Sequence, residues 1–98
     1  MIKSFASCGT EDIFNRRSSK VARRTCPEEL WRIARRKLDQ LNAVVSLASL
    51  RIPPGNQLEA PKGDRERQHS IRVNSQFRVC FGWTDEGPED VEIVDYHR

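Results

Sequence analysis

An alternating apolar run near the C-terminus is the feature that most limits how this chain can fold. Its apolar members are separated by single residues: Phe77, Val79, Phe81 and Trp83. A two-residue period is typical of a β-strand that buries one face, and it directs Arg78 and Cys80 to the opposite face. Shorter alternating segments lie on either side, at Ser70–Val73 and Val91–Tyr96, beyond turn-forming residues. The sequence therefore predicts an antiparallel meander of three strands.

Two helices are expected ahead of this meander. The sequence of Thr25–Glu28 matches a capping box with proline in the first turn. Apolar residues then recur at steps of three and four: Leu30, Ile33, Ala34, Leu38, Leu41 and Val45. This pattern predicts an amphipathic helix to about Leu47. A shorter helix is expected over Glu11–Phe14, with Thr10 as its cap.

The fold class follows from the order of these elements. Met1–Phe5 alternates between apolar and polar residues and is predicted to be a first strand. We therefore expect an α+β fold, in which a single antiparallel sheet of the N-terminal strand and the C-terminal meander is packed by two helices. A chain of 98 residues suits one domain, residues 1–98. The other face of the sheet is then available for a functional site.

Charge is distributed unevenly along the chain. Residues 1–84 hold 16 Lys and Arg against 8 acidic residues, a net +8, whereas residues 85–98 hold six acidic residues against Arg98, a net −5. A basic body suits a polyanion such as nucleic acid, although ordinary solvated charge explains it equally well. The most basic segment is expected to form a mobile loop with these members: Arg16, Arg17, Lys20, Arg23 and Arg24.

Several classes of protein are excluded by what the sequence lacks. Cys8, Cys26 and Cys80 lie far apart without metal-ligand spacing, which indicates thiols in a reducing compartment. There is no metal motif, phosphate-binding glycine loop or nucleophile elbow. No segment has the apolar core of a signal peptide or the ~20 apolar residues of a membrane span. We therefore expect a cytoplasmic protein that uses neither a metal nor another cofactor.

Polar residues that could carry chemistry concentrate in the C-terminal half: Glu59, Lys62, Arg65, Arg67, His69, Arg72, Arg78, Asp95, Tyr96 and His97. A metal-free ribonuclease needs a base for the 2′-hydroxyl proton, a cation for the phosphorane and an acid for the 5′-oxygen. This set contains candidates for all three roles. The residues alone leave other interpretations open: Glu59 could pair with Lys62, Arg78 could form a salt bridge, and His97 could be an ordinary terminal residue.

Four short segments carry a resemblance to a known family by their order and spacing: Lys62–Arg65, Ser70–Asn74, Phe77–Phe81 and Asp95–Arg98. With the opening MIKSF and the amphipathic helix, the chain resembles HigB-type toxins of the RelE/ParE superfamily over nearly its whole length. The resemblance implies a fold of the microbial ribonuclease type. It also implies a type II toxin that inhibits translation by ribosome-dependent, metal-independent cleavage of messenger RNA.

The resemblance assigns catalytic roles to six residues: Glu59, Lys62, Arg78, Asp95, Tyr96 and His97. Arg78 matches the arginine that stabilises the phosphate, and Lys62 matches a basic position of the active site. Tyr96 and His97 match the terminal pair that positions substrate and transfers protons, with Asp95 in the same motif. Some relatives carry a histidine as the candidate base where this chain has Glu59, and a carboxylate can do the same work.

The resemblance also implies contacts outside the catalytic set. Seven basic residues are expected to contact RNA or the ribosome: Arg16, Arg17, Lys20, Arg23, Arg24, Arg65 and Arg72. Contacts to phosphates give sequence-independent, salt-sensitive affinity. The implied partner is a HigA-type helix-turn-helix antitoxin, through which alone operator DNA would be bound. A gyrase-directed toxin of the ParE branch and a non-catalytic RNA- or ribosome-binding module are the alternatives.

Overall fold

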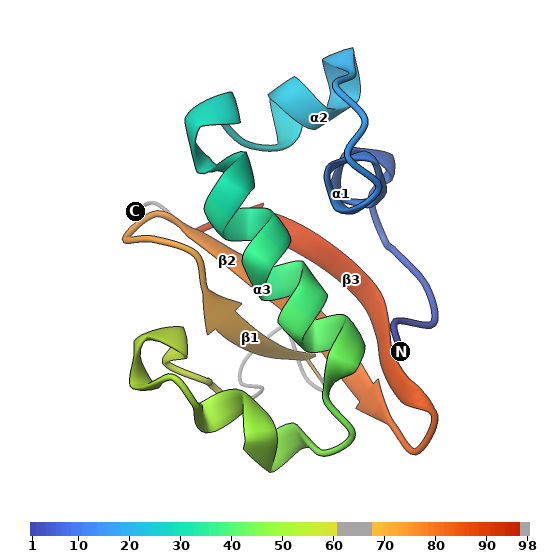
Figure 1. The fold of residues 1–98 in the computed structure, drawn as a ribbon, viewed down its shortest axis with the longest axis vertical. Helices are drawn as coiled ribbons and strands as arrows, with labels where there is room; N and C mark the ends of the chain where they lie inside the picture. Colours follow the sequence, from blue (N-terminus) through green and yellow to red (C-terminus); the bar gives the residue numbers. More distant parts are fainter. Residues whose placement is uncertain (61–67, 97–98) are drawn as a thin grey trace.

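The computed structural model describes residues 1–60 and 68–96. Its sheet contains three antiparallel strands in the order β1 (Gln68–Arg72), β2 (Phe77–Thr84) and β3 (Gly87–Asp95) (Figure 1). In the central register, Val79 of β2 lies opposite both Ile71 and Ile93. The predicted meander is therefore confirmed, with β3 beginning earlier than the alternation indicated.

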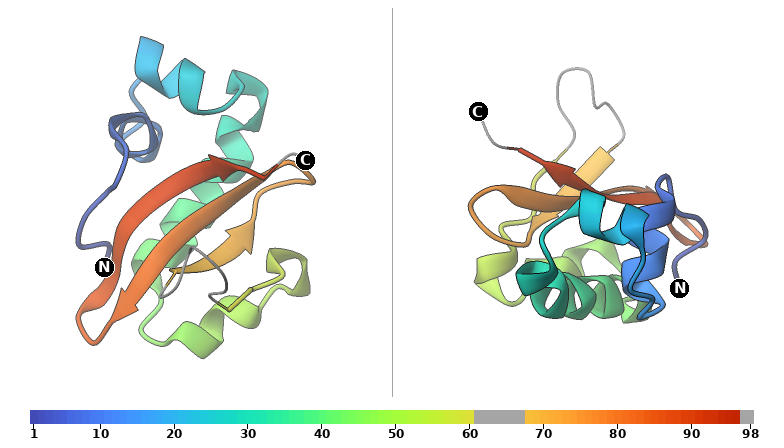
Figure 2. Two further views of the ribbon diagram at one scale, coloured as in Figure 1. Left: turned by 180° about the vertical axis from the view of Figure 1, so that it is seen from behind. Right: turned by 90° about the horizontal axis from the view of Figure 1, so that it is seen from above.

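The helices lie on one side of this sheet, and the longest of them crosses its face (Figure 2). In chain order they are α1 (Cys8–Phe14), α2 (Lys20–Thr25), η1 (Glu28–Leu30), α3 (Trp31–Ala43), η2 (Leu47–Arg51) and η3 (Pro54–Asn56), where η denotes a 3₁₀ helix. This layering confirms the predicted α+β class, and it leaves the second face of the sheet uncovered by these helices. Within the described ranges, no helix is long and apolar enough to cross a membrane.

The core lies between α3 and the sheet. The apolar face of α3 buries Ala34, Leu38 and Leu41, as the helical periodicity predicts. These side chains belong to the same buried cluster as Ile71, Val79, Phe81 and Val91 of the strands. The expected length of the helix is wrong, because the chain turns to an extended conformation at Val44 and leaves Val45 94% exposed.

The prediction that Met1–Phe5 forms an antiparallel strand of the sheet is wrong. Met1–Phe5 lies beside β3 and forms a single bridge, between Phe5 and Val91, which is parallel. The amide of Lys3 donates to the carbonyl oxygen of Pro88 at 2.8 Å, so the segment does cover the β3 edge. It forms no longer ladder because Ser7 caps α1 directly after it.

The basic segment after Asn15 is partly helical, which contradicts the expected mobile loop. Ser19 caps α2 by accepting a hydrogen bond from the amide of Ala22, and its hydroxyl donates to Asp12 at 2.6 Å. Ala22 is fully buried in the core cluster. A local serine cap and one small apolar residue are sufficient to order the segment, although it lacks a longer apolar period.

Both predicted helix caps are also wrong. Ser7, and not Thr10, caps α1. The hydroxyl of Thr10 is buried instead and accepts a hydrogen bond from the amide of Ile93 at 2.9 Å, which joins α1 to β3. At the second helix, η1 occupies the predicted first turn, and neither η1 nor α3 has a side-chain cap.

Candidate active site

The alternation in β2 places Arg78 on the sheet face opposite the helices. The strand register puts Arg72 and Val94 on either side of Arg78, and Ser70 opposite Cys80. We call the face defined by Ser70, Arg72, Arg78, Cys80 and Val94 the open face, since the helices cover the other one (Figure 2). The alternate residues of these strands, such as Ile71, Val79 and Ile93, belong to the core on the other face.

The guanidinium of Arg78 is held rigidly although it lies on this open face. Only 7% of the residue is exposed. Its Nε donates to Ser70 Oγ at 2.7 Å, and one Nη donates to the backbone carbonyl oxygens of Ser70 and Gln57. An arginine carries five N–H donors. Among the described residues none accepts a hydrogen bond from the other Nη, so its two N–H groups remain for a ligand.

A carboxylate lies next to this guanidinium. Glu59 Oε1 is 3.7 Å from Arg78 Nε, and the Glu59 side chain is 46% exposed. The backbone of Glu59 pairs with Ser70, because the amide of each donates to the carbonyl oxygen of the other at 2.9 and 3.2 Å. Ser70 therefore positions both groups at once. The result is a fixed cation beside an accessible proton acceptor.

Tyr96 lies on the same face at the end of β3. Its amide donates to the carbonyl oxygen of Gln76 at 2.6 Å, which fixes the backbone. The Cys80 thiol lies 3.6 Å from the Tyr96 hydroxyl, as a donor to it. Because Cys80 belongs to the open face, the phenol also lies over that face. The structure thus brings Tyr96 to the same surface as Arg78 and Glu59.

Asp95 belongs to the other face. It lies opposite Phe77 in the register, whose side chain packs in the core. The Asp95 carboxylate accepts a hydrogen bond from Gln76 Nε2 at 3.1 Å, across the end of the β2–β3 pair. Alternation along β3 therefore separates Asp95 from Arg78, although the two residues belong to one predicted set.

Several predicted residues lie outside the described part of the chain. These are Lys62 and His97 of the catalytic set and Arg65 of the RNA-contact set. Of the six predicted catalytic residues, the described structure therefore places Glu59, Arg78 and Tyr96 on one surface.

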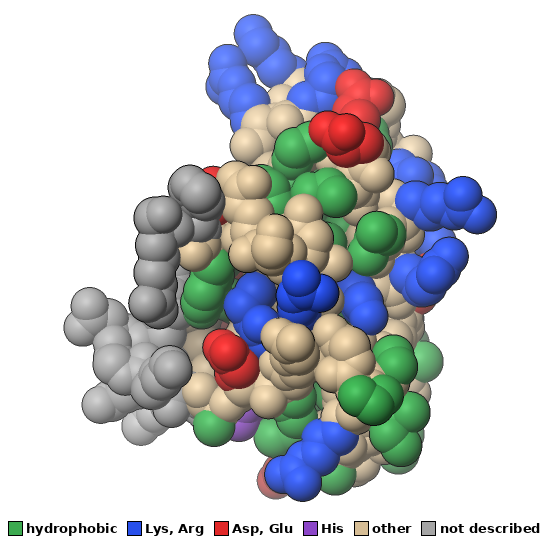
Figure 3. All heavy atoms as spheres, turned by 90° about the vertical axis from the view of Figure 1, so that its left-hand side faces the viewer, with side chains coloured by type: hydrophobic (Ala, Val, Ile, Leu, Met, Phe, Trp, Pro, Cys, Tyr) green, Lys and Arg blue, Asp and Glu red, His purple; other side chains and the backbone are tan. Residues whose placement is uncertain are grey.

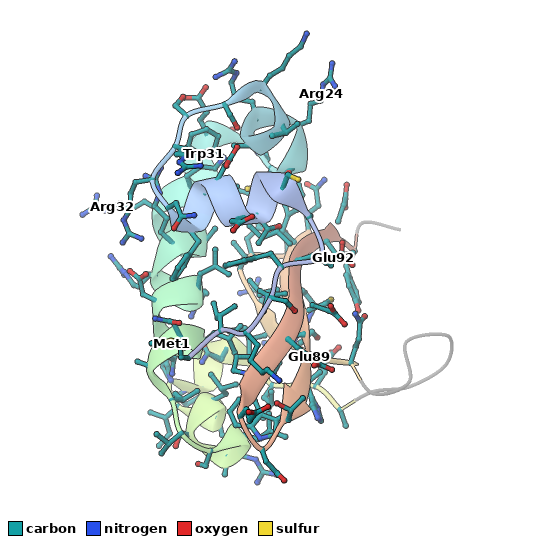
Figure 4. The ribbon with its side chains drawn as sticks, turned by 90° about the vertical axis from the view of Figure 1, so that its right-hand side faces the viewer. Met1, Arg24, Trp31, Arg32, Glu89 and Glu92 are labelled. Atoms are coloured by element: carbon teal, nitrogen blue, oxygen red, sulfur yellow. The ribbon has the colours of Figure 1, made fainter. Side chains whose placement is uncertain are left out.

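The basic residues around α2 do not adjoin this site. They lie at the end of the helix layer, where Figure 4 shows Arg24. Arg16 is paired with Asp39 at 2.8 Å, and the hydrogen bond to Asp39 raises the pKa of Arg16. The others are exposed: Arg17, Lys20, Arg23 and Arg24. Of the predicted RNA-contact residues in the described part, only Arg72 lies next to Arg78 in the sheet.

Sequence reasoning missed the residues that hold the site and a cavity beside it. The sequence alone could not identify Ser70 and Gln57 as hydrogen-bond partners of Arg78. Their roles depend on the register between β1 and β2 and on how residues 57–60 contact β1.

A cavity of about 630 Å³ borders residues 57–60, with Glu59, Arg51 and His69 in its wall. The His69 ring packs 6.0 Å from that of Phe81, and burial lowers the pKa of His69.

The thiols and carboxylates do not form a metal centre in the described ranges. Residues 1–60 and 68–96 contain no group of three or more His, Cys, Asp or Glu side chains placed to hold a metal ion. All three cysteines are free thiols. Burial raises the pKa of Cys26 to about 11, so this thiol remains protonated at neutral pH.

A three-stranded antiparallel sheet with helices on one face and a clamped arginine on the other is consistent with a RelE-like toxin fold. Residues 3–97 match a family model, HigB-like toxin, described as the RelE-like toxin of the type II toxin–antitoxin system HigB. The chain belongs to this HigB-like toxin family.

Two relatives illustrate how far the similarity extends. Toxin HigB-1 of Vibrio cholerae serotype O1 is 42% identical over 62 residues, which cover 63% of this chain and 65% of the relative. An uncharacterized protein of Haemophilus influenzae is 38% identical over 55 residues, which cover 56% of this chain and 54% of the relative. In both cases the match spans less than two thirds of the relative's length.

Proposed function

We propose that this chain is the toxin of a type II toxin–antitoxin pair, which cleaves messenger RNA on the ribosome and so inhibits translation. The observation that carries the proposal is the geometry at Arg78. A buried guanidinium is held by Ser70 and Gln57 and lies 3.7 Å from the half-exposed carboxylate of Glu59. Two of its N–H donors make no hydrogen bond with the described residues. A fixed cation beside a proton acceptor is what phosphodiester cleavage by an internal hydroxyl requires.

In the proposed reaction, the 2′-hydroxyl oxygen attacks the adjacent phosphorus while Glu59 accepts its proton. Arg78 donates hydrogen bonds to the non-bridging oxygens, whose negative charge increases in the phosphorane. The bond from phosphorus to the 5′-oxygen then breaks, and His97 protonates the leaving oxygen. The products are a 2′,3′-cyclic phosphate and a 5′-hydroxyl end. No step requires a metal ion.

The other predicted residues have supporting roles in this proposal. Tyr96 orients the nucleotide over the open face, and Lys62 adds positive charge near the phosphate. Asp95 acts at a distance, by fixing the strand end from which Tyr96 projects.

The family supports a partner as well as a substrate. We propose that a HigA-type helix-turn-helix antitoxin binds this chain and restrains its activity in the cytoplasm, where ribosomes are found. Operator DNA would be contacted only through that antitoxin. The exposed arginines around α2 are then available for ribosomal RNA or for the antitoxin.

Mapping the 5′-ends of cellular transcripts after brief induction tests the proposed function. We expect new 5′-hydroxyl ends inside translated regions, because cleavage depends on the ribosome. A matched transcript without a ribosome-binding site is the control and should remain intact. Growth arrest with a DNA-damage response and no new transcript ends would contradict the proposal and favour a gyrase-directed toxin.

A further inference from the structure

Cations gather at the β1 edge of the sheet, beside the candidate active site. Figure 3 shows Lys and Arg side chains together in the middle of this side of the molecule. Arg72 of β1 lies directly opposite Arg78 of β2 in the register. Like charges opposite each other in neighbouring strands destabilise a sheet. The fold thus retains a repulsive pair next to the proposed scissile phosphate.

A third cation, Lys37 of α3, joins this pair from the helix layer. Burial lowers the pKa of Lys37, and the nearby charges of Arg36 and Arg72 lower it further. Among the groups of the described chain that shift this pKa, none is a carboxylate. Geometry also places Lys37 near the pair, because its Nζ donates to Asn56 while Arg78 donates to the carbonyl oxygen of the next residue, Gln57. Glu59 lies beside Arg78, and no ion pair of the described residues joins a carboxylate to Lys37.

Lys37 is held in place by a neutral group. Its Nζ donates to Asn56 Oδ1 at 2.5 Å. Asn56 is fully buried, and its amide nitrogen donates to Gln40 Oε1 at 2.9 Å and to the Leu50 carbonyl oxygen at 3.0 Å. The described contacts thus fix the ammonium group without neutralising it. It has three N–H donors, and two of them make no hydrogen bond with the described residues.

The Arg72 side chain lacks a polar contact in the described part of the chain. Within residues 1–60 and 68–96, its side chain makes no hydrogen bond or ion pair, and the residue is partly exposed at the β1 edge opposite Arg78. An anion at this position would relieve the repulsion among the three cations. Groups that cost stability without a structural benefit are typical of functional sites.

We infer that Lys37 and Arg72 form a second phosphate site, which binds a neighbouring phosphodiester of the RNA strand whose scissile phosphate lies at Arg78. The inference rests on the proposed function for the identity of that strand. In this arrangement the RNA strand runs from the open face across the β1 edge toward α3. Positively charged grooves that follow the backbone are a common way to bind single-stranded RNA. A phosphate of ribosomal RNA has the same chemistry, so the test must separate the two sources.

The test measures binding to ribosomes that carry messenger RNA with a 2′-O-methyl group at the cleaved position, which cannot be cut because the attacking hydroxyl is blocked. We expect Arg72→Gln to weaken binding about three- to tenfold and to reduce the salt dependence by about one phosphate contact. Lys37→Met should have a similar effect. Arg72→Gln removes no hydrogen bond of the described fold, so it remains informative if Lys37→Met unfolds.

Arg32→Gln is the matched control, because it removes the same charge from the outer side of α3, where Figure 4 shows Arg32 pointing away from the sheet. It should bind programmed ribosomes like the wild type.

The second arm of the experiment measures binding to ribosomes without messenger RNA, and there Arg72→Gln should not change the affinity. Equal weakening in both arms would assign the phosphate to ribosomal RNA and overturn the inference. Wild-type affinity of both variants for programmed ribosomes would overturn it without affecting the proposed function, whereas no binding by the wild type would contradict both.

Discussion

Replacing Arg78 with alanine is expected to lower kcat for cleavage of ribosome-bound messenger RNA by about 10²–10³-fold, the usual loss when one fixed donor to a transition state is removed. The reason is that Ser70 and Gln57 hold the guanidinium before substrate arrives, so little reorganisation is needed as charge develops. Single-turnover cleavage with saturating ribosomes measures the effect. Growth arrest on induction should disappear in parallel.

The variant Arg78→Lys distinguishes a loss of catalytic rate from a loss of folding stability. Lysine keeps the positive charge but not the planar set of donors, so it cannot bind Ser70 and a phosphate in the same geometry. We expect it to lose most of the rate while its thermal unfolding remains close to that of the wild type. Arg32→Gln is the surface control and should retain full activity. A folded Arg78→Ala protein with wild-type kcat would contradict the assigned role.

Glu59→Gln is expected to reduce kcat by about 10²–10⁴-fold, the range for loss of a general base. Glutamine preserves the size of the side chain, and the backbone pairing of Glu59 with Ser70 does not depend on the carboxylate. The fold should therefore persist, which circular dichroism and thermal unfolding can check. The rate is measured under single-turnover conditions. An unchanged rate would show that another group accepts the 2′-hydroxyl proton.

Glu59→His provides the matched variant with a different base. An imidazole accepts a proton only when neutral, and its ordinary pKa is about 6.5. We therefore expect partial recovery of the rate relative to Glu59→Gln, with activity falling as the pH decreases through about 6.5. A flat pH profile for Glu59→His over this range would argue against proton transfer at residue 59.

The elements that sequence patterns predicted are those with strong apolar contrast. The alternation from Phe77 to Trp83 and the apolar spacing of Ala34, Leu38 and Leu41 each bury one face, so periodicity alone identified β2 and α3. The segments that failed depend on single local contacts. Ser19 orders α2, and Ser7 ends the N-terminal segment before it can form a ladder.

The same distinction applies to the candidate site. Alternation was enough to place Arg78 opposite the core face. Its partners could not be predicted, because Gln57 and Ser70 meet it only through the strand register and a bridge between Glu59 and Ser70. Asp95 and Tyr96 are adjacent in the motif, yet alternation in the observed register sends them to opposite faces.

The contact between Arg78 and the scissile phosphate can be tested most directly with a sulfur substitution. Messenger RNA with a phosphorothioate at the cleaved position is bound to ribosomes, and single-turnover cleavage is compared for the wild type and Arg78→Ala. If the guanidinium binds a non-bridging oxygen, sulfur should slow the wild type but slow the variant much less, because the two changes remove one interaction. An equal slowing of both proteins would show that Arg78 does not contact the phosphate that is cut.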